Sequence, residues 1–169
     1  MRAKRIARMA MLTAIALTIF MVEAQLPPLA PIPGIKLGLA NIVTIWAMFA
    51  LGPVDALMIL LARILMGSVF SGQMMTLAYS LSGGLLCWLS TLLLQKLLTD
   101  RQIWAASILG AMVHNLGQLL AASVIMGTWA VWYYCPILLI SGILTGAFTG
   151  LSAQFLHQRM KRIWKKESD

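Results

Sequence analysis

The sequence predicts an all-α, polytopic membrane protein: a bundle of six transmembrane helices with both ends in the cytoplasm. Composition is the first reason, because 60% of the 169 residues are hydrophobic and 11% are charged, whereas about 25% of the residues of a soluble domain are charged. The arrangement is the second. The apolar residues form six runs, and most of the 13 lysines and arginines lie at the two ends of the chain.

The first three runs are separated by residues that break helices. A helix needs about 20 apolar residues to cross the hydrocarbon core. The first run ends at Pro27-Pro28, because proline cannot continue a helix. The second run ends at Gly52-Pro53, and the third ends at Ser71-Gly72. These limits predict spans at residues 6–26, 36–52 and 54–70, of which the second and third are short and joined by a tight turn.

The last three runs are separated by polar links. The link at 95–102 follows the fourth run, and Gly127-Thr128 separates the fifth from the sixth. The predicted spans are residues 74–94, 103–126 and 131–155, followed by a basic cytoplasmic tail at 156–169. The chain is therefore predicted to be a single integral membrane domain, residues 1–169.

The positions of the basic residues predict the orientation, because cytoplasmic flanks are enriched in lysine and arginine. Two basic ends on one side require an even number of crossings, in agreement with six. The link at 95–102 carries Lys96 and Arg101 and then lies inside, whereas the uncharged link at 127–128 is followed by aromatic residues that suit the outer interface. We therefore expect a multi-pass protein of the cell membrane with both termini in the cytoplasm.

One alternative concerns the first span. Basic residues, an apolar stretch and Val22-Glu23-Ala24 also resemble a secretory signal peptide with a small-residue cleavage site. Cleavage would leave five spans with an outside start. The apolar stretch is long for a signal core, and the balance of basic ends favours six spans.

Polar side chains inside the spans indicate a candidate site, because a charged residue there costs at least about 2.5 kcal/mol on insertion scales. The candidate substrate-binding residues are Glu23, Lys36, Asn41, Arg63, Tyr79, His114, Asn115 and Gln118. In the predicted orientation all of them lie at or above the middle of the membrane, where they can line one pocket open to the outside. Lys36 and Arg63 favour an anionic group on the ligand.

Structural roles compete with this interpretation. Glu23 can neutralise Lys36 or Arg63, and buried amides can simply bind neighbouring helices together. Asp55, just after Gly52-Pro53, is explained by helix capping or solvent contact. His157 lies near the cytoplasmic end of the last helix, where a cation is favourable.

Small residues indicate where helices approach one another. Gly142, Gly146 and Gly150 recur every four residues on the sixth span, which allows close helix packing. Ala10 and Ala14 form a smaller version of the same pattern on the first span.

The familiar signatures of enzymes are missing from the sequence. It has no phosphate loop of the G-x-x-x-x-G-K-S type, no G-x-S-x-G elbow and no Cys/His metal spacing. The two cysteines are isolated, and the basic ends flank apolar runs where lipid headgroups, not nucleic acid, are the expected neighbours. We expect no catalytic residues, no metal, no cofactor and no enzymatic activity, so any active transport takes its energy from a partner or an ion gradient.

Three motifs resemble a known family. Residues 23–41 read E-A-Q-L-P-P-L-A-P-I-P-G-I-K-L-G-L-A-N, residues 63–68 read R-I-L-M-G-S and residues 81–84 read L-S-G-G. They look like the Gx transporter family, also labelled heptaprenyl diphosphate synthase component I. That family in turn resembles the substrate-binding S components of energy-coupling factor (ECF) transporters, which carry an A-x-x-x-A motif matched here by Ala10 and Ala14. The resemblance implies docking to a transmembrane coupling protein that is driven by two ATPases.

The leading hypothesis is therefore a substrate-binding membrane subunit of an ECF-type uptake transporter for a small organic solute. The Pro-rich link at 27–34 would form part of a lid, and the Ala10/Ala14 face would dock the coupling protein. One alternative is an accessory membrane component of isoprenoid or quinone synthesis, although the three scattered aspartates do not form the Asp-rich motifs of prenyl synthases. Another is a stand-alone ion-coupled carrier, in which His114 would be the proton-sensitive group.

Overall fold

The computed structural model describes residues 2–26, 36–72 and 74–168, which form six α-helices and one short 3₁₀ helix and contain no strand. The elements are α1 (Arg2–Glu23), α2 (Asn41–Ala50), α3 (Pro53–Ser71), α4 (Met74–Gln95), α5 (Ile103–Met126), η1 (Trp129–Tyr134) and α6 (Cys135–Ser168). The predicted all-α fold is confirmed. The predicted lid at 27–34 lies outside the described residues.

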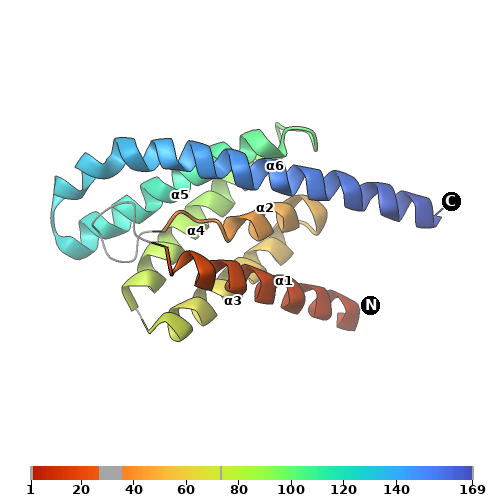
Figure 1. Cartoon of the computed structure of the whole chain (residues 1–169), viewed down its shortest axis with the longest axis horizontal. Coiled ribbons are helices and arrows are strands. Elements are labelled where there is room, and N and C mark those ends of the chain that lie inside the picture. The colour runs from red at the N-terminus through yellow and green to blue at the C-terminus, as the bar shows by residue number, and fades with distance from the viewer. Residues whose placement is uncertain (1, 27–35, 73, 169) are drawn as a thin grey trace.

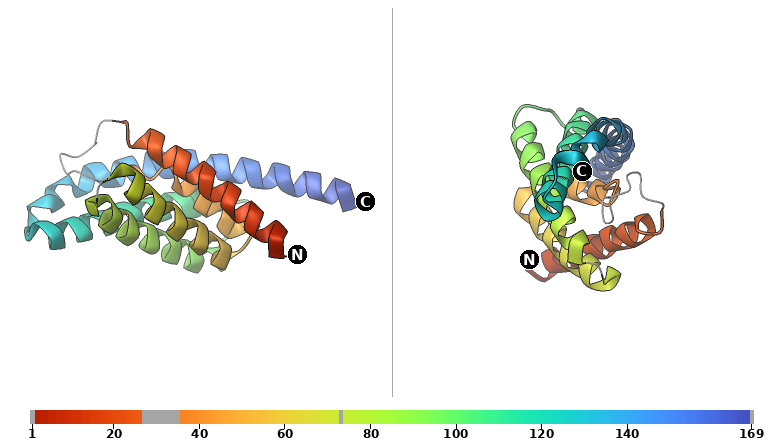
Figure 2. Two further views of the ribbon diagram at one scale, coloured as in Figure 1. Left: turned by 90° about the horizontal axis from the view of Figure 1, so that it is seen from below. Right: turned by 90° about the vertical axis from the view of Figure 1, so that its left-hand side faces the viewer.

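The helices run roughly along one long axis, with both termini at one end of the bundle (Figure 1). We call this the terminal end, and the opposite end, which carries η1, the far end. Helices α4, α5 and α6 pack side by side in that order, whereas α1 lies at the edge and packs on α2 and α3 (Figure 2). The left-hand view of Figure 2 shows that α6 extends beyond the rest of the bundle at the terminal end.

Five of the described helices, α1, α3, α4, α5 and α6, are long and apolar enough to cross a membrane. The exception is α2, whose 10 residues rise only about 15 Å, half of the hydrocarbon thickness of about 30 Å. The predicted span at 36–52 is therefore only partly helical. Residues 36–38 have no regular secondary structure and a turn at 39–40 follows, so that α2 begins only at Asn41.

Helix α6 differs from its prediction at both ends. The 3₁₀ helix η1 occupies the start of the predicted span, and α6 begins at Cys135. It then continues to Ser168, so the residues expected as a basic tail prolong the last helix. Its 34 residues measure about 51 Å at the α-helical rise.

The glycines of α6 face α5 at very short range. A Cβ atom placed on Gly146 would lie 2.7 Å from the Cα atom of Ile108, and one on Gly150 would lie 2.7 Å from the Cα atom of Trp104. At Gly142 the nearest atom would be the side-chain nitrogen of Asn115, at 3.0 Å. No real Cβ atom fits at the first two positions without a shift of the backbone, so these glycines let α5 and α6 pack closely.

Two apolar clusters divide the interior along the long axis. The larger one, toward the terminal end, is built around α2 and includes Trp46, Met48, Ile59, Ile103 and Ala153. The smaller one, toward the far end, joins Tyr79, Leu119, Ala122, Val131 and Leu138. On α5, the candidate residues His114, Asn115 and Gln118 lie between Ile103 of the larger cluster and Leu119 of the smaller one.

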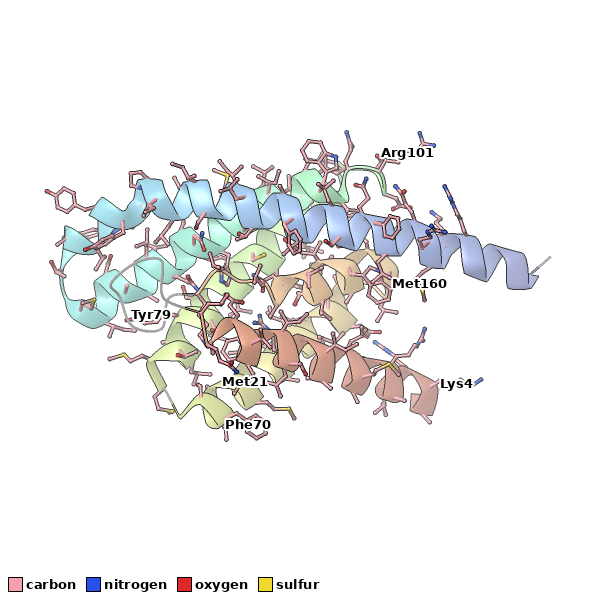
Figure 3. All side chains as sticks on the ribbon, in the orientation of Figure 1. Lys4, Met21, Phe70, Tyr79, Arg101 and Met160 are labelled. Atoms are coloured by element: carbon pink, nitrogen blue, oxygen red, sulfur yellow. The ribbon has the colours of Figure 1, made fainter. Side chains whose placement is uncertain are left out.

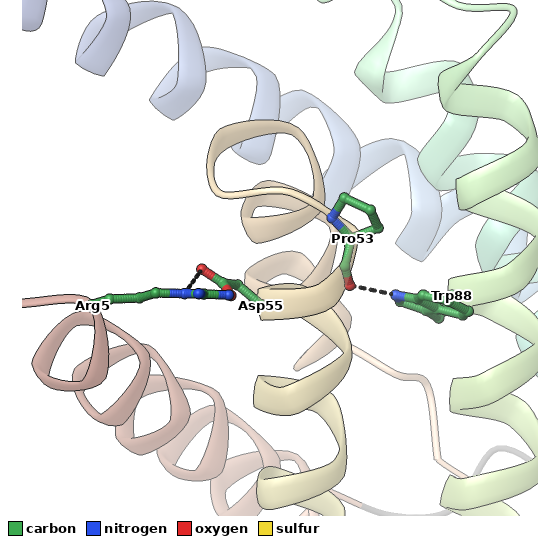
Figure 4. A network of polar contacts seen from close by, with 4 residues as sticks. All are labelled: Arg5, Pro53, Asp55 and Trp88. Carbon is green, nitrogen blue, oxygen red and sulfur yellow. Dashed lines mark hydrogen bonds and ion pairs between the residues drawn. The ribbon is translucent and has the colours of Figure 1, made fainter. Parts of the chain in front are cut away.

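The tight connection between α2 and α3 is held from both sides (Figure 4). Gly52 adopts a positive φ of 102° and Pro53 opens α3, as expected because glycine tolerates this backbone conformation and proline suits the first helical turn. Asp55 binds Arg5 of α1 in an ion pair, and Trp88 of α4 donates a hydrogen bond of 3.0 Å to the carbonyl oxygen of Pro53. The expectation that Asp55 caps the helix or contacts solvent is thus wrong, because the residue is buried, makes no capping hydrogen bond and pairs with a basic residue on the neighbouring helix.

Candidate functional site

Arg63 lies at the centre of a buried polar network. It is 3% exposed, and its Nη2 donates a hydrogen bond of 3.1 Å to Oδ1 of Asn41, the first residue of α2. The Asn41 amide nitrogen lies 3.3 Å from Nδ1 of His114 on α5, and the amide nitrogen of Gln118 lies 3.1 Å from Nε2 of the same ring. Helices α2, α3 and α5 therefore meet through buried polar side chains.

The donors of this network fix the state of His114. Arginine has only donors, so the Asn41 oxygen faces Arg63 and the Asn41 NH2 group faces Nδ1. In the neutral tautomer in which Nδ1 accepts this hydrogen bond, Nε2 holds the proton and can donate it. Gln118 can accept a hydrogen bond from Nε2 if its amide oxygen, and not its nitrogen, faces the ring. The two orientations differ only by a flip of the amide group. That orientation also satisfies Gln118 Oε1, which otherwise has no partner.

Glu23 is bound by backbone groups at the start of the α2 segment. Its Oε1 accepts a hydrogen bond of 2.6 Å from the Gly38 N–H, and its Oε2 accepts one of 2.9 Å from the Leu39 N–H. Gly38 has a φ of 81°, and successive N–H groups in such a turn form a concave anion site. The carboxylate at the end of α1 therefore anchors the extended segment and shortens α2.

Lys36 and Arg63 share the ring of Phe20. The Lys36 ammonium lies 3.7 Å from the ring centroid and the Arg63 guanidinium carbon lies 5.8 Å from it. Partial burial lowers the pKa of Lys36 below its usual value, and the positive charge of Arg63 lowers it further, whereas Glu23 opposes the shift. Two basic side chains, Lys36 and Arg63, and one acidic side chain, Glu23, therefore lie together at this position.

Two of the candidate residues are turned away from this network. Tyr79 is buried in the apolar cluster at the far end, against Leu119 and Val131. Asn115 faces α6, where its amide nitrogen donates a hydrogen bond of 2.6 Å to the carbonyl oxygen of Leu138. The structure thus brings together Glu23, Lys36, Asn41, Arg63, His114 and Gln118, and it places Tyr79 and Asn115 in helix packing.

Sequence reasoning missed three contributors to the site. They are Phe20, Gly38 and Gly83, the last of which packs so closely on His114 that a Cβ would lie 2.9 Å from Nδ1. The spacing of Phe20 and Glu23 offered a signal for the first, because residues three apart lie on the same face of a helix. The other two act through backbone geometry, which a glycine in an apolar sequence does not reveal.

Other charged residues that the structure describes, among them Asp55 and Asp100, lie outside this network. Figure 3 shows Lys4, Arg101 and Met160 toward the terminal end and Tyr79 toward the far end. Asp55 pairs with Arg5, and Asp100 pairs with Lys161 at 2.6 Å. Among the described residues, no group of three or more His, Cys, Asp or Glu side chains is placed to hold a metal ion.

Ala10 and Ala14 lie outside the network, on an exposed face of α1. They line a groove of about 480 Å³ between α1 and α3, which also contains Leu17, Met58 and Ala62. The groove is lined almost wholly by apolar side chains.

An all-α bundle of apolar helices around a buried polar network defines an integral membrane protein. The sequence model of the family described as heptaprenyl diphosphate synthase component I matches residues 12–156. The chain belongs to this family, which confirms the resemblance found in the sequence. No curated protein and no solved structure matches the chain.

Proposed function

We propose that this protein is the substrate-binding membrane subunit of an ECF-type uptake transporter, and that it captures a small organic solute carrying an anionic group. In this proposal the terminal end faces the cytoplasm and the polar network faces the outside. Its own chain supplies the binding site, and an associated coupling protein with two ATPases supplies the energy. It has no catalytic role of its own.

The observation that carries the proposal is Arg63. Within the described residues its Nε has no hydrogen-bond partner although the side chain is 3% exposed. Leaving a buried donor of a charged group unpaired costs more than about 1–3 kcal/mol. A carboxylate or phosphate of a ligand would satisfy the guanidinium, because its planar donors match such oxygens.

The interrupted second span supports the same proposal. Discontinuous helices in transporters present helix N-termini to anionic groups near the middle of the membrane. Here α2 begins at Asn41, directly at Arg63. The segment before α2 already binds one carboxylate of the protein itself, because the N–H groups of Gly38 and Leu39 donate hydrogen bonds to Glu23.

The groove between α1 and α3 supports a docking role for the Ala10/Ala14 face. Small exposed residues allow another helix to approach closely, and the groove is apolar over its length. A helix of the coupling protein is the proposed occupant.

A thermal-shift screen of the purified protein tests the binding site. Vitamins, flavins, quinone precursors and isoprenoid diphosphates would be compared, each acid beside its uncharged amide or ester. We expect an anionic compound to raise the melting temperature, because a ligand at 100 times its Kd stabilises by about 2.7 kcal/mol. No stabilisation by any acid, or equal stabilisation by the uncharged analogue, would reject the proposal.

Variants then localise the effect. Arg63→Gln removes the central cation. Lys36→Gln removes the half-buried ammonium group and serves as the test if Arg63→Gln does not fold. Arg159→Gln is the matched control, because Arg159 lies over the exposed ring of Phe155 at 5.4 Å, away from the network. The ligand response should disappear or weaken in the first two variants and persist in the control.

A second candidate function rests on the family description, which names a component of heptaprenyl diphosphate synthase. In that case the protein is an accessory membrane component of isoprenoid synthesis. Co-purification from native membranes distinguishes the two: the transporter proposal requires a coupling protein and two ATPases, and the accessory role requires a prenyl synthase.

A further inference from the structure

A charged pocket at the terminal end belongs neither to the polar network nor to the groove on α1. It has a volume of about 550 Å³ and lies between the α4–α5 link and α6. Its lining residues are Asp100, Arg101, His157, Gln158, Lys161 and Arg162. Three permanent cations and a histidine therefore face one carboxylate.

The neighbouring side chains place this pocket at the depth of lipid headgroups. On the bundle side, Leu151 and Phe155 of α6 and Trp104 of α5 are exposed, as lipid-facing residues are. One turn after Phe155, the guanidinium of Arg159 folds back over its ring. Such aromatic and basic residues mark the membrane interface, so the charges that begin at His157 lie just outside the hydrocarbon.

Part of the pocket is already organised. Lys161 Nζ donates a hydrogen bond of 2.6 Å to Asp100 Oδ2, and His157 Nε2 lies 3.8 Å from the same oxygen. The hydrogen bond from Lys161 holds the pKa of Asp100 below its usual value, so this residue remains a carboxylate at neutral pH. It keeps Lys161 beside the pocket and joins the α4–α5 link to α6.

The two arginines are not engaged in this way. For Arg101 and Arg162 the structure shows no hydrogen bond or ion pair with any described residue. Guanidinium groups bind phosphate oxygens in a bidentate manner. Two such groups therefore line the pocket, and Leu97, in the same α4–α5 link as Arg101, is 80% exposed.

We propose that this pocket binds the phosphate of an anionic lipid headgroup. Arg101 and Arg162 donate hydrogen bonds to the phosphate oxygens, Lys161 adds its charge, and the acyl chains lie along the exposed apolar residues of α5 and α6. Basic pockets beside transmembrane helices on the cytoplasmic side are suited to such lipids. The bound lipid would join the α4–α5 link to α6, as the Asp100–Lys161 pair already does.

The experiment uses the full-length protein in a neutral detergent and measures lipid binding by native mass spectrometry and by thermal shift. The probes are phosphatidylglycerol, cardiolipin, phosphatidylcholine and inorganic phosphate. We expect the two anionic lipids to bind and stabilise the protein, and phosphatidylcholine and free phosphate to do neither. Stabilisation by free phosphate equal to that by phosphatidylglycerol would overturn the assignment to a lipid, as would equal binding of phosphatidylcholine.

Variants test the residues. Arg101→Gln and Arg162→Gln should each weaken phosphatidylglycerol binding about fivefold, the contribution of one basic residue at an anionic membrane surface. Asp100→Asn should strengthen binding, because it removes the competing carboxylate. Arg159→Gln is the control, since Arg159 lies on the same turns of α6 but is not among the residues that line the pocket, and its guanidinium lies over Phe155. An effect of Arg159→Gln as large as that of Arg162→Gln, or weaker binding in Asp100→Asn, would overturn the proposal.

Discussion

At the scale of single residues, one arginine determines the polarity of the whole network. Because Arg63 can only donate, Asn41 must accept from it and donate to His114, which leaves His114 Nε2 as a donor to Gln118. A ligand that binds Arg63 would therefore act on the same donors and acceptors.

Replacing Asn41 tests this dependence. Asn41→Leu keeps the size of the side chain but removes the acceptor of Arg63 and the donor to His114. We expect a loss of stability of about 1–3 kcal/mol, the cost of buried polar groups without partners, measured as a lower melting temperature in detergent.

Ser152→Ala is the control for Asn41→Leu. The Ser152 hydroxyl bonds only within its own helix, to the carbonyl oxygen of Phe148, at an exposed position. Its loss should change stability by less than about 0.5 kcal/mol. Equal effects of the two substitutions would mean that the network contributes nothing specific.

Lys36 predicts how ligand binding depends on pH. Burial and Arg63 lower its pKa, so Lys36 loses its proton at a lower pH than an ordinary lysine, whose pKa is about 10.4. Under the proposed function, affinity for an anionic ligand should fall as the pH rises toward that ordinary value. Lys36→Arg should remove this decline, because arginine stays protonated. Titration calorimetry between about pH 7 and pH 10 measures both; a decline unchanged in Lys36→Arg would contradict the role of Lys36.

At the scale of elements, two adjacent glycines of α4 face different helices, Gly83 facing α5 and Gly84 facing α3. A Cβ on Gly83 would lie 2.8 Å from the backbone oxygen of His114, whereas one on Gly84 would lie 3.1 Å from the terminal methyl groups of Leu60 and Ile64. The backbone of α5 cannot move away cheaply, but side-chain ends can. Alanine substitutions at Gly83 and Gly84 therefore make a matched comparison, in which only the first forces a backbone to move.

We expect Gly83→Ala to destabilise the protein by about 1–3 kcal/mol through overpacking. It should also weaken ligand binding, because it displaces His114. Gly84→Ala should be close to neutral, since alanine also favours the helix over glycine. Melting temperatures of the two variants provide the comparison, and equal losses would show that the close contact at His114 is unimportant.

Not every element was predictable from the sequence. The limits of α3, α4 and α5 follow from Gly, Pro and polar links, and the structure agrees with them to within about two residues. The shortening of α2 was not visible, because residues 36–52 are apolar enough to form a full span. It depends on hydrogen bonds between the Glu23 carboxylate and the Gly38 and Leu39 N–H groups, which are tertiary contacts that no local pattern encodes.

The site was predictable to a similar extent. Charge and polarity within apolar runs were sufficient to select the residues that form the network. They did not separate Asn115, which lies next to His114 in the sequence but faces α6. Adjacent helical residues point about 100° apart, so only the positions of the neighbouring helices decide which of them faces the site.

At the scale of the whole molecule, the orientation remains a prediction that can be tested by thiol labelling. A reporter cysteine at Tyr133, which is 88% exposed at the far end, should react with a membrane-impermeant reagent in intact cells. One at Lys4, at the terminal end, should react only after permeabilisation. Cys135 would be replaced by serine, and Cys87 is buried. The reverse pattern would place the polar network on the cytoplasmic half and reject capture from outside.

The shortness of α2 has a consequence for biogenesis. A helix of 10 residues is too short to partition into the bilayer as an independent span, so it cannot leave the insertion machinery in the way that the longer helices do. We expect α2 to enter the membrane as a hairpin with α3, joined at Gly52-Pro53, or to enter only after α1 and α3 have been inserted. The Glu23 contact to Gly38 and Leu39 would then form late, making assembly of the binding network the final step of maturation.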